Sequence, residues 1–275
     1  MTDFVPEFND ASKATMLKSG RWVWEPHEGW LQGRTVFGGL TVAAIANAMT
    51  VEVLAGLAAG SAQPILRTIQ YSFPAPILPQ EAIIEVIVDR RGSSATFVSA
   101  VVNQNGQVVG RANAVFGASR DSDVNKSLAA PVLDMTLDEA TTFPYIEGVT
   151  PEFTRNFDMK WAVSEYPFGQ GTEGIVGGYA RHKSEAQGVP AILALLDTWP
   201  PSVLPMFKEP AAASSVALTM HIVEDVPVVG PDDWFEFKYT TQSAAHGYTT
   251  EIGQLSYEGK VIAWVEQLVA VFDKR

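Results

Sequence analysis

Two segments of the sequence resemble each other, and this internal repeat limits the folds that the chain can adopt. Residues 105–116 read NGQVVGRANAVF and residues 258–272 read EGKVIAWVEQLVAVF, so each runs from a tight turn through an apolar strand to Val-Phe. An apolar segment lies upstream of each, VFGGLTVAAIANAM at 36–49 and QGVPAILALLDTW at 187–199. Each half therefore predicts one apolar helix followed by antiparallel strands, as in a duplicated small unit. The duplication is also an internal control, because a polar residue matched by an apolar one in the other half is not required by the fold.

The length and composition of the chain agree with two globular units. The chain has 275 residues, of which 47% are hydrophobic and 18% are charged. This length fits two units of about 120 to 140 residues, with ample apolar side chains for a core. No run of about 18 uncharged apolar residues occurs, and the N-terminal residues lack the basic and then apolar order of a secretory signal. We therefore expect a soluble, cytoplasmic protein without membrane insertion.

Charge and residue content limit the partners and the chemistry. The formal net charge is -12, which argues against nucleic acid and anionic membranes, since both need a basic surface. The chain has no cysteine and four scattered histidines, so it offers neither a cysteine nucleophile nor the spacing of a metal site. We expect a mechanism without metal. A phosphorylated ligand would need a local cationic patch, and the candidates are Arg90 with Arg91 and the cluster of Arg181, His182 and Lys183.

The pattern of apolar residues and turn signals predicts the elements. A glycine-rich turn delivers the chain into a helix within 33–49, and a second helix spans about 189–199 before Pro200-Pro201. The turn Asn105-Gly106 predicts a hairpin between the two strands that flank it. Strands are predicted at 21–26, 68–73, 82–89, 94–103 and 107–117, and again at 153–161, 174–183, 216–223, 234–241, 248–257 and 260–272.

These elements group into two units with a connection between them. We predict an N-terminal unit at 1–120, a linker at 121–150, where prolines are scattered and periodicity is weak, and a C-terminal unit at 151–275. One helix wrapped by a long antiparallel sheet, given twice, is the double-hotdog arrangement. The predicted fold class is therefore α+β, with two tandem hotdog units.

Asp197 is the first polar residue that the repeat singles out. It follows PAILALL, a segment that is apolar on every side and therefore central to its unit. A carboxylate at the C-terminal end of a helix faces the negative end of the helix dipole, and burial disfavours its charged form further. The alignment of Gly188 with Gly38 places Asn47 opposite Asp197, so the fold accepts a neutral amide here. Asp197 is either an ordinary hydrogen-bonded end of a helix or a functional carboxylate.

Gln267 and Ser215 are singled out in the same way. Gln267 shares a strand face with five apolar residues, and the repeat matches it with Ala114. A buried amide must find hydrogen-bond partners, either in neighbouring backbone or in a polar site. Ser215 corresponds to Leu66 in the first half. Two neighbours in the sequence, Ser214 and Thr219, compete with Ser215 for any role that needs a hydroxyl.

Four motifs in this order resemble the acyl-CoA thioesterase II family. They are VFGG before the first helix, RRGSSATF before a hairpin, LLDTW at the end of the second helix, and GKVIAWVEQ in the last strand. The resemblance covers the chain from about Gln32 to the C-terminus. It implies hydrolysis of an acyl-CoA thioester, with coenzyme A as part of the substrate and no separate cofactor. The family holds a water molecule with an Asp, a Thr and a Gln, which correspond here to Asp197, Ser215 and Gln267.

The resemblance also implies roles for groups around the carbonyl of the substrate. The water would attack while Asp197 orients it or accepts its proton, without a covalent intermediate. A developing oxyanion needs preorganised donors, which a helix N-terminus can supply. Gly38 and Gly39 would permit a close approach of the substrate to the backbone, although the pair can equally serve a tightly packed turn. Gly188 is an equivalent candidate in the second half, and the sequence leaves open which of the two helix ends meets the carbonyl. Arg90 and Arg91 are the candidates for binding coenzyme A.

Two other functions are compatible with this fold. A hotdog hydratase would use an acid-base pair, for which His221 is the residue to consider. A non-catalytic acyl-ligand binder or assembly subunit would need no such pair, because a fold alone does not establish an activity. Edge strands in such a sheet usually need to be covered, so we also expect a homo-oligomer, a dimer of double hotdogs.

Overall fold

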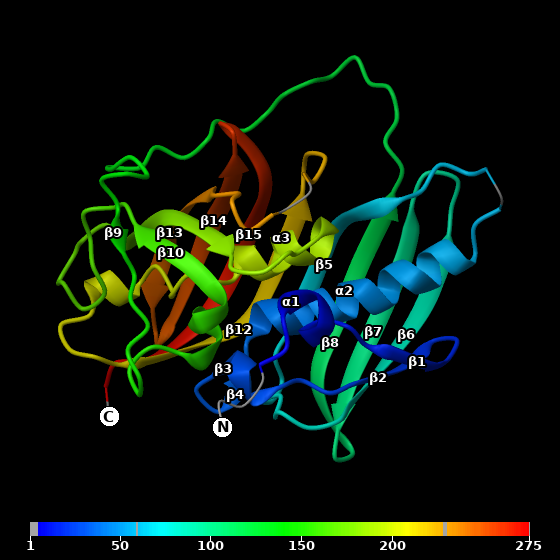
Figure 1. The fold of residues 1–275 in the computed structure, drawn as a ribbon, viewed down its shortest axis with the longest axis horizontal. Helices are drawn as coiled ribbons and strands as arrows, with labels where there is room; N and C mark the ends of the chain where they lie inside the picture. Colours follow the sequence, from blue (N-terminus) through cyan, green and yellow to red (C-terminus); the bar gives the residue numbers. More distant parts are fainter. Residues whose placement is uncertain (1–4, 59, 228–229, 275) are drawn as a thin grey trace.

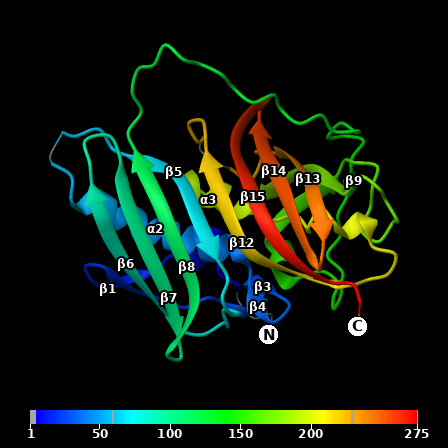
Figure 2. The ribbon, with the colours of Figure 1, turned by 180° about the vertical axis from the view of Figure 1, so that it is seen from behind.

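The chain forms one continuous antiparallel sheet with its two main helices on one face. The structure is a computed structural model that describes residues 5–58, 60–227 and 230–274. Its main sheet has 13 strands in the order β1-β2-β6-β7-β8-β5-β12-β15-β14-β13-β11-β10-β9, and β3 pairs with β4 in a second, two-stranded sheet. The helices cover the face seen in Figure 1, and the strands lie in front when the molecule is seen from behind in Figure 2.

The first unit wraps a long helix in six strands of the main sheet. The helix α2 spans Gly38–Ala55. The strands are β1 (Thr15–Lys18), β2 (Arg21–Trp24), β5 (Ile65–Ser72), β6 (Ala82–Arg91), β7 (Thr96–Gln104) and β8 (Gln107–Gly117). Shorter elements are α1 (Phe8–Ala11), the 3-10 helix η1 (Glu28–Trp30), β3 (Leu31–Gln32) and β4 (Thr35–Val36).

The second unit repeats this plan around a shorter helix. The helix α3 spans Gly188–Leu196. The strands are β9 (Thr141–Thr142), β10 (Phe157–Trp161), β11 (Ile175–His182), β12 (Ala212–Ile222), β13 (Phe235–Ala245), β14 (Tyr248–Tyr257) and β15 (Lys260–Phe272). Two 3-10 helices, η2 (Glu152–Asn156) and η3 (Leu204–Met206), complete it. All the predicted strands are present, and the predicted bounds of β14 and β15 are confirmed to the residue.

The two units repeat each other down to their β-bulges. A bulge interrupts the register between Leu66 and Thr68 in β5, and another lies between Ser215 and Ala217 in β12. Two further bulges match across the units. The bulge between β7 and β8 corresponds to the one between β14 and β15. The bulge between β6 and β7 corresponds to the one between β13 and β14. The units join edge to edge, where Thr68–Ser72 of β5 pairs with Ala217–His221 of β12. Matching residues of the two halves can therefore be compared position by position.

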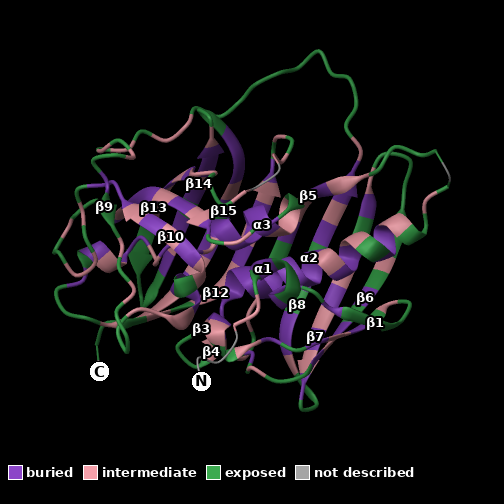
Figure 3. Cartoon of the chain, in the orientation of Figure 1, coloured by how far each residue is buried: buried purple, intermediate pink, exposed green. Residues whose placement is uncertain are grey.

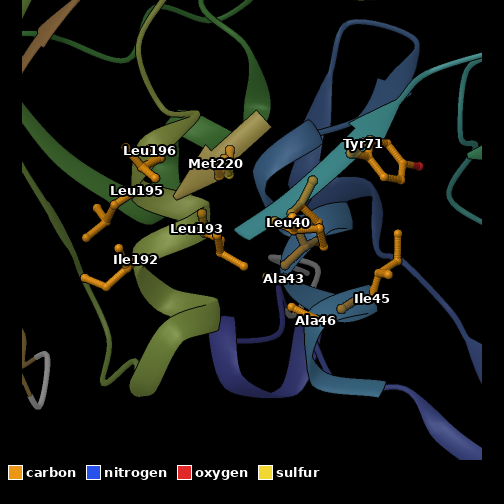
Figure 4. Close-up of a cluster of buried hydrophobic side chains, with 14 of the residues drawn as sticks. Leu40, Ala43, Ile45, Ala46, Tyr71, Ile192, Leu193, Leu195, Leu196 and Met220 are labelled. Atoms are coloured by element: carbon orange, nitrogen blue, oxygen red, sulfur yellow. The ribbon is translucent and has the colours of Figure 1, made fainter. Parts of the chain in front are cut away.

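The core lies between the helices and the sheet. Figure 4 shows α2 and α3 side by side, with Leu40 and Ala43 of one helix near Leu193 of the other, and the buried colour of Figure 3 follows both helices. Among the described residues, α2 is the one helix long and apolar enough to cross a membrane, and 72% of it is buried inside the protein. Its apolar composition is thus used in the packing of the core.

The second helix ends earlier than the sequence indicates. The pattern predicts a helix to about Trp199, but α3 ends at Leu196 and Asp197 is its C-cap, with φ -111° and ψ 9°. Its last turn tightens, and the N–H groups of Asp197 and Thr198 donate to carbonyls three residues back, Ala194 O and Leu195 O. This early end places Asp197 where the chain leaves the helix.

The ends of the sheet and the connection between the units are irregular. The sheet ends in β1, with four residues, and β9, with two, and such short edge strands are one way to protect a sheet edge. Edge strands this short need less cover from a partner chain, and the dimer stays a prediction. Within the predicted linker, β9 pairs with β10 and Ala129 forms a bridge with Lys260. The backbone oxygens of Val132, Met135 and Leu137 also accept hydrogen bonds from side chains of β13, β11 and β10.

Candidate active site

A cleft lies where the N-terminus of α2 meets the C-terminus of α3. It has a volume of about 250 Å³ and takes its walls from both units. Its lining residues are Gln32, Thr35, Val36, Gly38, Phe73, Pro74, Ala75, Pro76, Asp197, Ala213, Ser214 and Ser215. Two of the three residues that the sequence comparison singled out, Asp197 and Ser215, thus face one cavity.

Asp197 stands between the ends of two helices. It is unfavourably placed on its own helix, at the negative end of α3, but its carboxylate lies against the positive end of α2. The backbone N–H of Gly39, in the first turn of α2, donates a hydrogen bond to the carboxylate. The second unit therefore supplies the acid, and the first unit supplies a helix N-terminus that holds it.

Burial shifts the protonation of Asp197. Removal from water disfavours the charged form and raises the pKa of Asp197 from 3.8 to about 7. The Gly39 N–H lowers this pKa, and the negative charge of Glu251 raises it further. Such a carboxyl can take up and release a proton near neutral pH, as a general base must.

Glycine at position 38 leaves room beside the carboxylate. A Cβ at Gly38 would lie 2.5 Å from Asp197 Oδ2 and 3.2 Å from the ring of Phe73. Any other residue would therefore fill the part of the cleft that adjoins the acid. This close approach is the reason for a glycine here, since its φ is not positive.

Gly39 serves a different contact. A Cβ at Gly39 would lie 2.8 Å from the backbone oxygen of Ala194 and 2.5 Å from the ring of Phe37. Glycine at this position lets α2 approach the last turn of α3, and its N–H is directed at Asp197. The structure therefore assigns the Gly39 N–H to the acid, whereas the sequence pattern suggested it for the carbonyl of a substrate.

Ser215 and Gln267 meet at the wall of the cleft. The side-chain amide of Gln267 donates a hydrogen bond to the hydroxyl of Ser215. Gln267 is 5% exposed, so its amide is satisfied from within the protein by this contact. In the first unit the matching residues are Leu66 and Ala114, both buried and apolar. The three selected residues are thus assembled at one place, and only in the second unit.

The two competing hydroxyls differ in position. Ser214 is exposed and lines the cleft beside Ser215, but the strand alternation turns it away from the core. Thr219 pairs with the exposed Glu266 and lies on the outer face of the sheet, among Gln70, Arg111 and Asn113. The bulge after Ser215 is what brings Ser215, and neither of these neighbours, to the amide of Gln267.

The predicted cationic residues lie away from the cleft. Arg91 donates hydrogen bonds from its guanidinium to the backbone oxygens of Glu52 and Val53, in the last turns of α2. That position is roughly 20 Å along the helix from Gly38, and Arg90 is its exposed neighbour. Arg91 therefore stabilises a helix end, since a cation favours the C-terminal carbonyls. The structure does not bring these two residues to the candidate site.

The second cationic cluster is not an open patch either. The side chain of Arg181 lies 3.0 Å from Asp158, and Lys183 lies 3.8 Å from the same carboxylate. His182 is fully buried between Phe8 and Phe157, and burial lowers its pKa to about 4. This histidine is neutral near pH 7 and belongs to the core.

His221 does not support the hydratase alternative. It lies on the outer face of the sheet, stacked on Trp264 with 4.2 Å between the ring centroids. Its neighbours on adjacent strands are Thr68 and Trp264. It is therefore on the opposite side of β12 from Ser215 and the cleft.

One buried acid near the site was missed by the sequence analysis. Glu251 in β14 is 2% exposed and accepts hydrogen bonds from the backbone N–H and the hydroxyl of Ser202. Its match in the first unit is Val98, so the comparison of the two halves could have found it. The strand pattern of 248–257 does not mark this acid, whereas the match with Val98 does.

Comparison with known proteins identifies the family. Residues 26–117 match the model of the acyl-CoA thioesterase N-terminal domain, and residues 135–271 match that of the acyl-CoA thioesterase C-terminal domain. No curated protein matches this chain in sequence. The predicted linker at 121–150 overlaps the gap between the two matched ranges, and the second match begins within it.

Solved structures show the same fold. A conserved protein of unknown function with a hot dog fold from Alicyclobacillus acidocaldarius superposes with a TM-score of 0.83 at 20% identity, covering 96% of this chain and 97% of that one. A candidate thioesterase II from Thermobifida fusca YX gives 0.80 at 22% identity, with 98% and 99% covered. The acyl-CoA thioesterase II TesB2 from Mycobacterium marinum gives 0.74 at 14% identity, with 96% of each chain covered.

These likenesses over whole chains confirm the predicted α+β double hotdog. The two family matches together span most of the sequence and have the same order as the two units. The chain therefore belongs to the acyl-CoA thioesterase family and is a thioester hydrolase.

Proposed function

We propose that the chain hydrolyses acyl-CoA thioesters with a water molecule that Asp197 activates. The observation that carries this proposal is the convergence of Asp197 and Ser215 on one cleft, with Gln267 bonded to Ser215. The matching positions of the first unit carry Asn47, Leu66 and Ala114, so packing does not require these polar groups. An acid, a hydroxyl and an amide at one cavity are suited to holding and deprotonating a water molecule.

The reaction follows from what each group can do. Asp197 accepts a proton from water as the water oxygen bonds to the thioester carbon, and the carbonyl oxygen becomes negatively charged. Ser215 and Gln267 hold the water in line for this attack. The carbon–sulfur bond then breaks, the carbonyl re-forms, and the proton on Asp197 passes to the departing thiolate of coenzyme A. The products are a free acid and coenzyme A, without a covalent intermediate.

The N-terminus of α2 is the proposed site of the oxyanion. Unpaired backbone N–H groups of a first helical turn can stabilise developing negative charge. Gly38 opens this turn and lines the cleft beside Asp197. The carbonyl of the substrate would therefore lie against Gly38, next to the acid that activates the water.

The raised pKa of Asp197 predicts the pH dependence of the reaction. Asp197 must be ionised to accept a proton, and its pKa is about 7. We expect kcat/KM to fall as pH drops through about 7, approaching tenfold per pH unit below that point, and to level off above it. Initial rates between pH 5 and 9 with one acyl-CoA would measure this acidic limb of the pH profile of kcat/KM. A limb near pH 4, where an ordinary aspartate titrates, would contradict the role of the buried acid.

Release of free thiol tests the proposed function directly. The native chain is incubated with acyl-CoAs of graded chain length, and the coenzyme A thiol is titrated as it appears. We expect turnover with at least one chain length. We expect none with the matching thioether analogue, in which a methylene group replaces the carbonyl next to sulfur. Binding of the acyl-CoAs without thiol release would favour the acyl-ligand binder instead.

A further inference from the structure

A row of polar side chains crosses the second unit behind the cleft. Glu251 of β14 pairs with Gln267 of β15 on one side and with Thr241 of β13 on the other. Gln267 is in turn bonded to Ser215 of β12. Directly paired residues of antiparallel strands have Cβ atoms about 5 Å apart on the same face. Ser215, Gln267, Glu251 and Thr241 therefore form one connected polar row.

The first unit has no such row. By the shared register and bulges, the four matching residues are Leu66, Ala114, Val98 and Val88, in the same order. All four are apolar, and they pack in or against the core. The hotdog unit can therefore pack with a valine at the position of Glu251. A buried ionisable group is costly without compensating contacts, so this glutamate needs another explanation.

Glu251 holds the segment that follows Asp197. One oxygen of its carboxylate accepts from Ser202 N at 2.5 Å and from Ser202 Oγ at 2.6 Å, and Ser202 Oγ lies 2.9 Å from Thr241 Oγ1. Ser202 follows Asp197 by five residues, through the Pro200-Pro201 turn. Glu251 thus ties this turn to the sheet and limits where Asp197 can move.

The charge of Glu251 also reaches the site. It adds to the effect of burial in raising the pKa of Asp197, and burial, Asp197 and Glu251 together raise the pKa of Tyr239 of β13. The other elements packed here present uncharged groups among the described residues, namely Gln267, Ser215 and the first turn of α2. Burial raises the pKa of Glu251 to about 7, and its two hydrogen bonds from Ser202 act in the opposite direction, in favour of the ionised form.

We propose that Glu251 is a positioning residue for the thioesterase reaction, which fixes the turn behind Asp197 and, when ionised, adds a negative charge to its surroundings. This inference rests on the proposed function of Asp197. Glu251 is 2% exposed and does not line the cleft, so it acts on the reaction through Asp197 and without contact to the substrate.

The test is Glu251→Gln, which keeps the shape of the side chain and removes its charge. The acidic limb of kcat/KM is expected to move to lower pH by about one unit, because the negative charge of Glu251, which raises the pKa of Asp197, is gone. A purely structural role predicts a lower melting temperature with the limb in its native place. An unmoved limb in a folded variant would overturn the proposal.

Glu52→Gln is the matched control. Glu52 is a buried glutamate of the first unit, 8% exposed, and accepts from Gly20 N at 2.8 Å and Trp22 Nε1 at 3.0 Å. It lies in the second half of α2, away from the cleft. This variant also replaces a buried carboxyl group by an amide, but the acidic limb of its pH profile is expected to stay in place. A similar shift in both variants would count against a local effect of Glu251.

A second readout separates this inference from the proposed function. The carboxyl carbon of Asp197 is followed by ¹³C NMR from pH 4 to 9 and assigned by comparison with Asp197→Asn. If the native chain releases no thiol, the proposed function fails. The titration of Asp197 still shows whether Glu251 affects the protonation of Asp197. A lower midpoint in Glu251→Gln supports the inference, and an unchanged midpoint overturns it.

Ser202→Ala keeps the test open if Glu251→Gln does not fold. It removes one donor to Glu251 and leaves the carboxyl in place, so Glu251 holds its negative charge less strongly. The limb is expected to move in the same direction and by less than in Glu251→Gln. An unmoved limb in Ser202→Ala would overturn the proposal.

Discussion

Replacement of Asp197 by asparagine is expected to lower kcat for thioester hydrolysis by about 10²- to 10⁴-fold, because an amide cannot accept the proton of the attacking water. The shape of the side chain is kept, and the first unit carries an amide, Asn47, at the matching position. The variant should therefore fold. Steady-state thiol release at pH 8 measures the effect, since Asp197 with its pKa of about 7 is mostly ionised there.

Stability should change in the opposite direction. The pKa of Asp197 is raised on folding, so its contribution to stability is fully present below the unfolded value of 3.8 and is lost as pH rises through about 7. At pH 8 the ionised carboxylate thus opposes folding, and Asp197→Asn is expected to melt at or above the native temperature. A loss of activity that comes from unfolding would lower the melting temperature.

Asp134→Asn is the control for this experiment. Asp134 accepts a hydrogen bond from Ser164 N at 2.7 Å and does not line the cleft. The Asp134→Asn variant also replaces one carboxylate by an amide, and its kcat is expected to equal that of the native chain. Full activity in Asp197→Asn would rule out proton transfer to this residue.

Replacement of Gly39 by alanine is expected to lower the free energy of unfolding by about 1 to 3 kcal/mol, the usual cost of overpacking a core. The added Cβ would lie 2.8 Å from the backbone oxygen of Ala194, which cannot move without shifting α3. Because Gly39 also donates to Asp197, a shift of the helices would separate the acid from the N-terminus of α2. We therefore expect kcat to fall as well, at temperatures where the variant is folded.

Gly117→Ala provides the comparison for Gly39→Ala. Gly117 is also buried, but its Cβ would lie 3.2 Å from Ser94 O and 3.7 Å from the side chain of Arg67. These contacts need only a small adjustment of the neighbours. Chemical denaturation of both variants measures the two effects, and equal losses would show that the approach of α2 to α3 is not tight.

The elements of the chain could be predicted because their signals are local. Alternation of apolar residues identified β14 and β15, and Asn105-Gly106 identified the hairpin of β7 and β8. Shorter pieces such as β1, β9 and the 3-10 helices carry too few residues for a periodic pattern. The helix α3 ends earlier than its apolar pattern indicates, because its last turn closes with hydrogen bonds three residues back, which apolar periodicity does not mark.

The candidate site was predicted in part for a similar reason. Asp197, Ser215 and Gln267 stand out when the two halves are compared, and that comparison needs only the sequence. Arg91 was chosen for its charge alone, and charge does not tell whether an arginine faces a ligand or caps a helix. Glu251 was overlooked, although Val98 in the other half marks it in the same way.

The sequence by itself determined the duplication, the alternation of each strand and the residues at which the second unit became polar, because these depend on near neighbours and on the match between halves. Only the tertiary structure decided that the N-terminus of α2 meets the C-terminus of α3. This meeting places Asp197 beside Gly38 and joins Glu251 to Ser202, through contacts between residues far apart in the chain. No local pattern specifies such contacts, since they follow from the edge-to-edge pairing of the two units.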